Sequence, residues 1–147
     1  MRKSSRRNPQ TSSAPWQPPT HSLKTILAVD DDSAVLGFLD QSLRMAGYNV
    51  LLADCGWSAI SVYENSTEPV HLLLTDVIMP DLTGPVVAER LRSRQPDLRV
   101  LFISGFHDAD VVQRFVMRKG FTLLPKPFTV EGLLRVVEET LNSDQGR

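Results

Sequence analysis

Short runs of apolar residues recur along the chain, and each run is bounded by polar or turn residues. Every run is too short for a buried helix and has the length of a strand. The runs lie at Thr25–Val29, Asn49–Ala53, His71–Thr75, Leu98–Ile103 and Phe121–Leu124. The first, third and fourth are almost continuously apolar, which indicates central strands of a parallel sheet covered on both faces.

Apolar residues recur at helical spacing in the stretches between and after these runs. Ser33 can cap the first helix, and Gly47 is suited to end it. Pro85 lies where proline favours the first turn of the third helix. The predicted helices are Ser33–Ala46, Trp57–Asn65, Pro85–Arg94, Ala109–Arg118 and Thr129–Leu141.

Strands and helices therefore alternate along the whole pattern. This alternation at short spacing indicates βαβ units, and hence an α/β fold in which helices cover both faces of a doubly wound parallel sheet. Each crossover should be right-handed. We expect a single domain at residues 23–142, with an N-terminal tail at 1–22 and a C-terminal tail at 143–147.

The N-terminal tail differs in composition from the rest of the chain. It is rich in Pro, Ser and Thr, and residues 1–20 carry four cations and no acid. Such a segment cannot bury enough surface to offset its ordering entropy, so we expect disorder. No apolar stretch follows the basic start, which excludes a signal peptide.

Composition narrows the class of protein. The residues after the first 20 sum to a charge of −5, because the whole chain has a net charge of −1. This mild acidity argues against non-specific nucleic-acid binding by that part of the chain, and we expect no specific nucleic-acid partner.

The hydrophobic fraction of 41% supplies a core, yet no apolar run is long enough to span a membrane. Cys55 is the single cysteine, so no intramolecular disulfide can form, and we expect a cytoplasmic protein.

Polar residues follow the carboxyl ends of four predicted strands. In an open parallel sheet, ligands bind in the crevice at those ends. The residues are Asp30, Asp31 and Asp32 after the first strand, Asp76 after the third, Ser104 after the fourth and Lys126 after the fifth.

These residue types suit phosphoryl chemistry. Clustered carboxylates resist joint ionisation unless a cation lies among them. Mg²⁺ prefers one or two carboxylates together with water and phosphate oxygens, and Asp30, Asp31 and Asp76 fit that preference. A carboxylate can also attack phosphorus to give an aspartyl phosphate. Lys126 and Ser104 would then provide a positive charge and a hydroxyl donor for the phosphoryl oxygens.

Each of these residues also has an ordinary structural explanation. Asp32 can cap the helix that follows it, Ser104 with Gly105 can form a turn, and Lys126 can be solvated. We favour a functional site because the residues follow four strands of one predicted sheet.

Four motifs in this order resemble the receiver domains of two-component response regulators. The resemblance covers residues 24–141 and depends on the joint order and spacing of the motifs. They are Ile-Leu-Ala-Val-Asp-Asp-Asp at 26–32, Leu-Leu-Thr-Asp-Val-Ile-Met-Pro-Asp-Leu-Thr-Gly at 73–84, Phe-Ile-Ser-Gly at 102–105 and Leu-Pro-Lys-Pro-Phe at 124–128.

The resemblance implies a flavodoxin-like sheet with strand order 2-1-3-4-5. It also implies that Asp76 accepts the phosphoryl group from a histidine kinase or a histidine phosphotransfer protein. Asp30, Asp31 and the backbone carbonyl of Ile78 match the family's Mg²⁺ ligands. Ser104 matches the switch hydroxyl. Lys126 matches the lysine that pairs with the phosphoryl group, and its bond to Pro127 would be cis.

One residue departs from the family pattern. Leu123 stands where the family usually has Tyr, Phe or His as an aromatic switch, and we interpret it as a strand residue packed on a helix. The chain resembles receivers that stand alone and act through a partner or a relay.

A partner surface is also implied by the resemblance. A downstream target or a second copy would bind the face of helix four, strand five and helix five. That face would include Val111, Val112, Phe115, Leu133 and Val136, although core packing must account for at least half of them.

Two other functions fit parts of the pattern. One is a receiver-like interaction module that never carries phosphate, which an incomplete site would favour. The other is a Mg²⁺-dependent phosphatase with an aspartyl nucleophile, for which Asp30 and Asp32 supply the Asp-x-Asp spacing. The phosphatase is disfavoured because Ala34 replaces the expected Thr or Val and because no cap domain is present.

Overall fold

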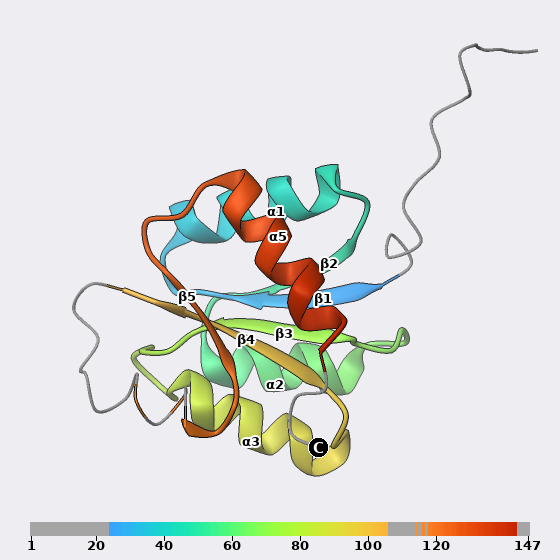
Figure 1. The fold of residues 1–147 in the computed structure, drawn as a ribbon. Helices are drawn as coiled ribbons and strands as arrows, with labels where there is room; N and C mark the ends of the chain where they lie inside the picture. Colours follow the sequence, from blue (N-terminus) through green and yellow to red (C-terminus); the bar gives the residue numbers. More distant parts are fainter. Residues whose placement is uncertain (1–23, 106–113, 115, 117, 144–147) are drawn as a thin grey trace, which may run out of the picture.

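Five parallel strands form one sheet with the order β2-β1-β3-β4-β5 (Figure 1). The computed structural model describes residues 24–105, 114, 116 and 118–143. The strands are β1 (Thr25–Val29), β2 (Asn49–Ala53), β3 (Leu72–Asp76), β4 (Arg99–Ser104) and β5 (Thr122–Pro125). The helices are α1 (Ser33–Met45), α2 (Gly56–Asn65), α3 (Gly84–Arg94) and α5 (Val130–Leu141). The predicted fold class and strand order are confirmed.

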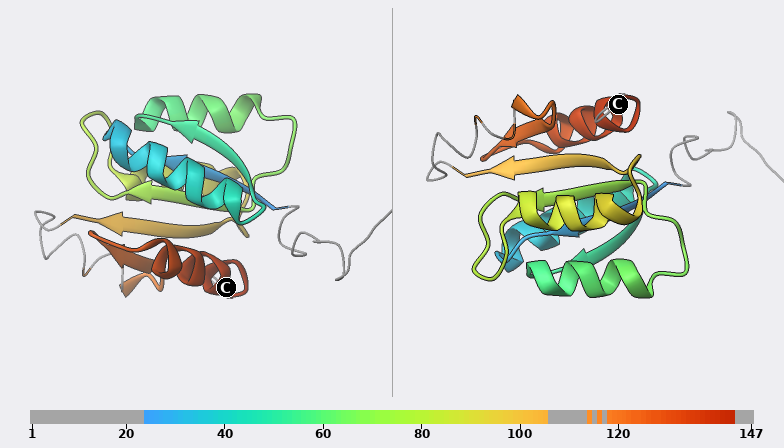
Figure 2. Two further views of the ribbon diagram at one scale, coloured as in Figure 1. Left: turned by 90° about the horizontal axis from the view of Figure 1, so that it is seen from above. Right: turned by 90° about the horizontal axis from the view of Figure 1, so that it is seen from below.

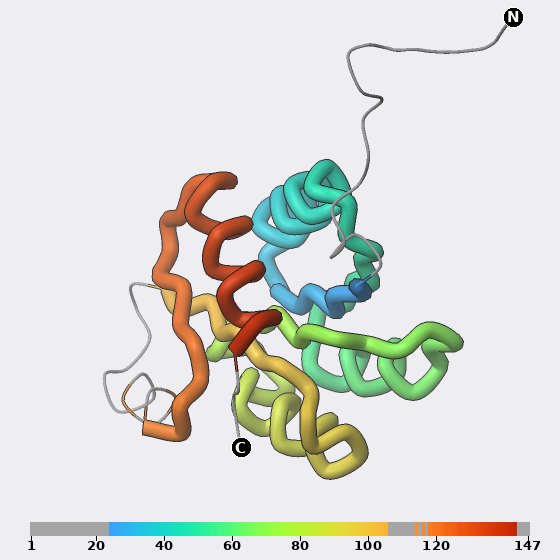
Figure 3. Tube along the Cα trace, turned by 45° about the vertical axis from the view of Figure 1, so that its right-hand side comes forward, coloured from blue at the N-terminus to red at the C-terminus, as the bar shows by residue number. Residues whose placement is uncertain are grey.

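Helices cover both faces of the sheet. α1 and α5 lie on one face, and α2 and α3 lie on the other (Figures 1 and 3); Figure 2 shows the two faces in turn. Alternate residues of each strand enter opposite cores, because side chains alternate along a strand. Leu27 and Leu73 belong to the core on the α2–α3 side, whereas Ile26 and Leu72 belong to the core on the α1–α5 side. This double covering explains the continuous apolar runs of the central strands.

Strands β3, β4 and β5 begin and end one residue later than predicted. The apolar pattern stops before Asp76 and Ser104, but backbone pairing continues through both. Asp76 is in register with Ile103, and Ser104 is in register with Pro125. The pairing therefore places two polar residues inside the ladder, where hydrophobicity alone does not reveal them.

Ser33 was wrongly predicted as the cap of α1. The cap is Asp32, whose carboxylate accepts hydrogen bonds from Ala34 N (2.9 Å) and Val35 N (3.4 Å). Gly47 follows the helix with a φ of 99°, a left-handed conformation that favours glycine and confirms its predicted role.

The other helices differ from prediction at their first residues. α2 and α3 each begin one residue earlier than predicted, and Thr129 caps α5 rather than opening it. The predicted helix at 109–118 lies largely outside the described residues, although Arg114, Val116 and Arg118 are helical. Residues 1–22 and 144–147 also lie outside the described part of the chain. No helix in the described part of the chain is long and apolar enough to cross a membrane.

Gly84 brings the start of α3 against the end of β3. Its N–H donates to the carbonyl of Val77 at 2.7 Å. A Cβ at this position would overlap the backbone carbonyl oxygen of Asp76 and lie 3.1 Å from the ring of Phe102. The carbonyl belongs to a buried strand and cannot move aside, so this approach requires glycine.

We predict that Gly84→Ala lowers the free energy of unfolding by about 2 kcal/mol or more, through overpacking against the backbone of β3. Gly37→Ala is the matched control, since a Cβ at Gly37 has no atom within 4 Å. The control should stabilise the protein by about 0.5–1 kcal/mol, because alanine is the better helix former. Urea unfolding measures both effects, and an equally stable Gly84→Ala protein would show that the approach is not tight.

His71 joins the starts of β1 and β3 at the opposite edge of the sheet from Asp76. Its Nδ1 accepts a hydrogen bond from Thr25 N at 2.9 Å, which requires Nδ1 to be unprotonated. Burial, together with the nearby Lys24, lowers the pKa of His71 below its ordinary value of 6.5. The folded protein therefore favours the neutral ring.

This lowered pKa predicts a pH dependence of stability. Above pH 6.5 the ring of His71 is neutral in both the folded and the unfolded chain. As the pH falls, the unfolded chain binds the proton first, so the contribution of His71 is lost as the pH passes through the folded-state pKa. Between about pH 8 and about pH 5, the free energy of unfolding in urea should therefore fall less in His71→Gln than in the unaltered protein. Parallel pH profiles for the two proteins would contradict this.

Candidate functional site

Three carboxylates meet at the carboxyl ends of β1 and β3. Asp30, Asp31 and Asp76 each offer an oxygen, and these oxygens all lie within 4.8 Å of one another. Asp30 is completely buried and Asp76 is 7% exposed, whereas Asp31 is exposed. The structure thus brings together the carboxylates that the sequence placed at two separate strand ends.

Backbone hydrogen bonds hold the strand ends that carry these carboxylates. Asp30 N donates to Ala53 O at 3.3 Å, which links the end of β1 to β2. Val77 N donates to Ile103 O at 3.0 Å, which links the residue after β3 to β4. The positions of Asp30 and Asp76 are therefore set by the sheet rather than by loops.

Lys126 approaches the carboxylates from the loop after β5. Its backbone N–H donates to Ser104 O at 2.8 Å, and its Nζ lies 3.3 Å from Oδ2 of Asp76 and 3.3 Å from Oδ2 of Asp30. Burial alone would lower the pKa of Lys126, but Asp76 and Asp30 together raise it above its ordinary value. Lys126 is therefore a cation shared by two carboxylates, and its bond to Pro127 is cis, as expected.

Asp30 is only partly compensated by its protein partners. Its Oδ1 accepts from Asp32 N at 2.9 Å, while Oδ2 forms an ion pair with Lys126 that lacks hydrogen-bond geometry. Burial raises the pKa of Asp30 despite both partners. A buried carboxylate oxygen without a hydrogen bond, beside two further carboxylates, fits a hard divalent cation such as Mg²⁺.

Ser104 lies at the same edge, as the last residue of β4. It is buried, and its hydroxyl lies 3.4 Å from the carbonyl of Gly105, to which it donates. Ile78 lies two residues after Asp76 and its side chain is exposed. Leu123 is half-buried and packs against the core on the α2–α3 side, as expected for a strand residue.

The predicted partner face is only partly described. Val111, Val112 and Phe115 lie outside the described residues. Leu133 is fully buried in the core on the α1–α5 side, so the prediction that it contributes to a partner face is wrong. Val136 is half-buried against the same core.

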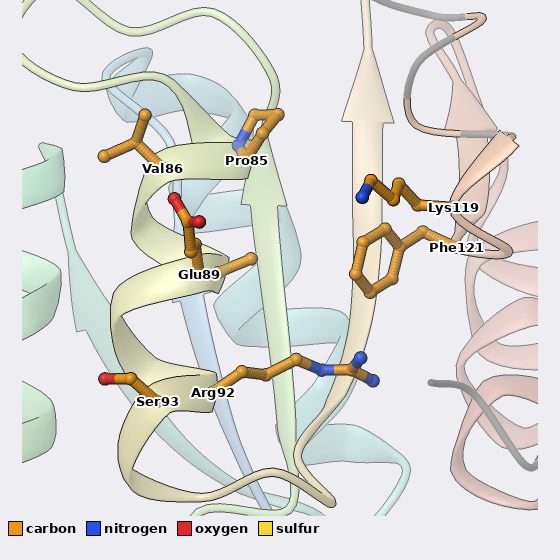
Figure 4. Close-up of a pocket in the computed structure, with 8 residues that line it drawn as sticks. Pro85, Val86, Glu89, Arg92, Ser93, Lys119 and Phe121 are labelled. Atoms are coloured by element: carbon orange, nitrogen blue, oxygen red, sulfur yellow. The ribbon is translucent and has the colours of Figure 1, made fainter. Parts of the chain in front are cut away.

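Groove size does not identify the site. A groove of about 590 Å³ lies between α3 and the start of β5, with Glu89, Lys119 and Phe121 among its lining residues (Figure 4). Arg92 also lines it, but its Nε donates to Leu98 O and its guanidinium stacks on Phe121 at 4.8 Å. This groove contains none of the clustered carboxylates.

A smaller groove borders the carboxylates. Its volume is about 320 Å³, and it is lined by Lys126 together with apolar residues of α1 and of the loop after β5. The apolar residues are Ala34, Val35, Phe38, Pro127 and Phe128. Phe38 packs against Phe128 with ring centroids 5.7 Å apart. The charged site thus has an apolar border on the α1 side.

Sequence reasoning missed Asp81, which lies in the loop between β3 and α3. Its carboxylate accepts hydrogen bonds from the backbone amides of Gly56 and Trp57, more than 20 residues away in the chain. An aspartate after a proline resembles an ordinary turn residue, so the local sequence carries no signal of this contact.

Comparisons with known proteins agree with this geometry. Residues 26–138 match the family described as response regulator receiver domain. The chain is 37% identical over 120 residues to the response regulator receiver protein CpdR of Brucella abortus, covering 81% of this chain and 98% of CpdR. It is 32% identical over 117 residues to the sensor kinase CckA of the same organism, covering 80% of this chain but 12% of the kinase. The crystal structure of a response regulator receiver domain protein from Clostridium thermocellum has a TM-score of 0.74 and 26% identity, covering 82% of this chain and 95% of that chain.

We predict that Lys126→Met lowers the stability of the metal-free protein by about 1–3 kcal/mol, because Asp30 and Asp76 lose their shared cation. Added Mg²⁺ should restore part of the loss, since the ion replaces the missing positive charge. Arg135→Met, at an exposed position of α5, is the control and should be nearly neutral. Thermal unfolding in EDTA and in Mg²⁺ measures these differences, and equal losses for the two variants would contradict the shared-cation role.

Proposed function

Because the chain belongs to the response regulator receiver domain family of two-component signalling, we propose that it accepts a phosphoryl group on Asp76 with the help of Mg²⁺. The observation that carries the proposal is the cluster of Asp30, Asp31 and Asp76, in which Lys126 forms ion pairs with Asp30 and Asp76. These groups are the acceptor, the metal ligands and the counter-charge that acyl-phosphate formation needs.

The chemistry follows from the placement of these groups. A carboxylate oxygen of Asp76 attacks the phosphorus of a phosphohistidine; a P–O bond forms while the P–N bond breaks and the imidazole leaves. Asp30, Asp31, Asp76 and the carbonyl of Ile78 would hold Mg²⁺, which would neutralise charge on the phosphoryl oxygens. Lys126, already 3.3 Å from Asp76, neutralises charge on the other side, and the Ser104 hydroxyl donates to a phosphoryl oxygen.

A histidine kinase or a histidine phosphotransfer protein would be the donor. Such a protein has to bring its phosphohistidine to Asp76, and the apolar groove of Val35, Phe38 and Phe128 beside Lys126 is the surface that we expect it to contact. We place this protein in the cytoplasm. In this role the protein catalyses only its own phosphorylation and dephosphorylation, and it signals by binding a partner or by passing the phosphoryl group along a relay.

The geometry also bears on the two alternatives. A phosphatase with an Asp-x-Asp motif needs the second aspartate for proton transfer, but here Asp32 caps α1 with its carboxylate. An interaction module without phosphorylation would not need three carboxylates gathered within 4.8 Å of one another, where they repel. Both observations favour the phosphorylated receiver.

Incubation with acetyl phosphate and Mg²⁺, followed by intact mass spectrometry, should add one phosphoryl group to the protein. Asp76→Asn should remove the adduct, because the amide is not a nucleophile toward phosphorus. The experiment requires no knowledge of the natural donor.

Asp54→Asn is the matched control. Asp54 also follows a strand at this edge of the sheet, but it is exposed and not part of the carboxylate cluster. Its variant should be phosphorylated normally. An adduct that persists in Asp76→Asn, or no adduct on the unaltered protein, would falsify the proposal.

A further inference from the structure

The loop at residues 77–83 joins β3 to α3 and carries Ile78. The first half of the loop is held by the core, because Val77 and Met79 are buried on either side of the exposed Ile78. The loop is closed at its base by the hydrogen bond from Gly84 N to Val77 O, at 2.7 Å. The core thus holds the residues on both sides of Ile78, and the rest of the loop, residues 80–83, has to be held by other contacts.

Asp81 holds the second half of the loop to a different element. Its Oδ1 accepts from Gly56 N at 2.9 Å, and its Oδ2 accepts from Trp57 N at 2.8 Å. Leu82 packs into the space beside Gly56, where a Cβ would lie 2.6 Å from the Cβ of Leu82. The loop is thus fitted to the first turn of α2 by a bidentate carboxylate and by an apolar contact.

The first turn of α2 has a strong electrostatic reason to bind this carboxylate. α2 has no acidic residue in its own first turn, and its cap, Cys55, offers only a sulfur that accepts from Ser58 N at 3.4 Å. Free N–H groups and the helix dipole favour an anion at this end. The hydrogen bonds from Trp57 and Gly56 lower the pKa of Asp81 to about 2, so it is charged at neutral pH.

We propose that Asp81 is a positioning residue for the metal site, which holds the loop so that the carbonyl of Ile78 can bind Mg²⁺. This inference rests on the proposed function. Asp81 binds backbone amides of α2 and acts on the metal through the loop between Ile78 and itself. A role limited to capping α2 would change stability alone, whereas a positioning role makes metal affinity depend on Asp81.

Metal affinity is measured by adding Mn²⁺ to the full chain, following the electron paramagnetic resonance signal of free Mn²⁺, and displacing the bound ion with Mg²⁺. Asp81→Asn keeps the size of the side chain but turns an NH₂ group toward one of the two amides. Asp81→Ala removes both acceptors. Each variant should bind the metal roughly tenfold more weakly, as is usual when a group that orients a ligand is lost.

Thr129→Ala is the matched control, because it removes the cap of another helix, where Thr129 accepts from Gly132 N at 3.0 Å. It should lower stability in urea and leave metal affinity unchanged. Unchanged affinity in the Asp81 variants, or an equal loss in Thr129→Ala, overturns the inference. If Asp81→Ala does not fold, the metal affinity of Asp81→Asn alone tests the inference.

Asp31→Asn separates this inference from the proposed function. It removes a proposed ligand, so it should abolish Mn²⁺ binding if the metal site exists. Unaltered protein that binds no Mn²⁺ overturns the metal site and the inference together. Binding that is lost in Asp31→Asn but unchanged in both Asp81 variants overturns only the role of Asp81.

Discussion

The ion pairs of Lys126 with two buried carboxylates constrain the rest of the structure. A charged group removed from water loses several kcal/mol of hydration unless other charges or hydrogen bonds replace it. Asp30 is completely buried, and its compensation comes from one backbone N–H and from the ammonium of Lys126. Lys126 can supply its charge only if β5 ends beside β4, so the local chemistry requires the global topology.

The parallel sheet meets this requirement with little help from loops. Parallel pairing aligns the carboxyl ends of neighbouring strands, and β1 and β3 are adjacent although a helix, a strand and another helix separate them in the chain. The pairing of Ser104 with Pro125 then places Lys126 one residue beyond the ladder, where its N–H binds Ser104 O. Gly84 completes the arrangement, because it lets α3 begin directly against the backbone of Asp76.

The residues at strand ends could be predicted from the sequence, whereas the contacts made by loops could not. The continuous apolar runs predict the central strands, and the polar residues that follow these runs indicate the candidate site, because both signals are local. Asp32 and Asp81 show the limit. Both are aspartates near turns, yet Asp32 caps the helix that follows it, whereas Asp81 binds amides of α2 that precede it by more than 20 residues. The hydrogen bond from Thr25 N to His71 joins residues that are still farther apart in the sequence. No local pattern encodes such contacts, since they exist only after the sheet has formed.

Sharing one lysine between two carboxylates has a consequence for the proposed chemistry. Lys126 lies at the same distance, 3.3 Å, from Asp30 and from Asp76. A phosphoryl group on Asp76 adds negative charge on one side of the lysine, which strengthens that interaction and weakens the one with Asp30. Asp30 is buried and would then need positive charge from another source, which a divalent ion among the carboxylates would supply. Metal binding and phosphorylation should therefore favour one another, and thermodynamic linkage makes the effect reciprocal. This coupling needs no aromatic residue at Leu123, which is half-buried and packs against the core on the α2–α3 side.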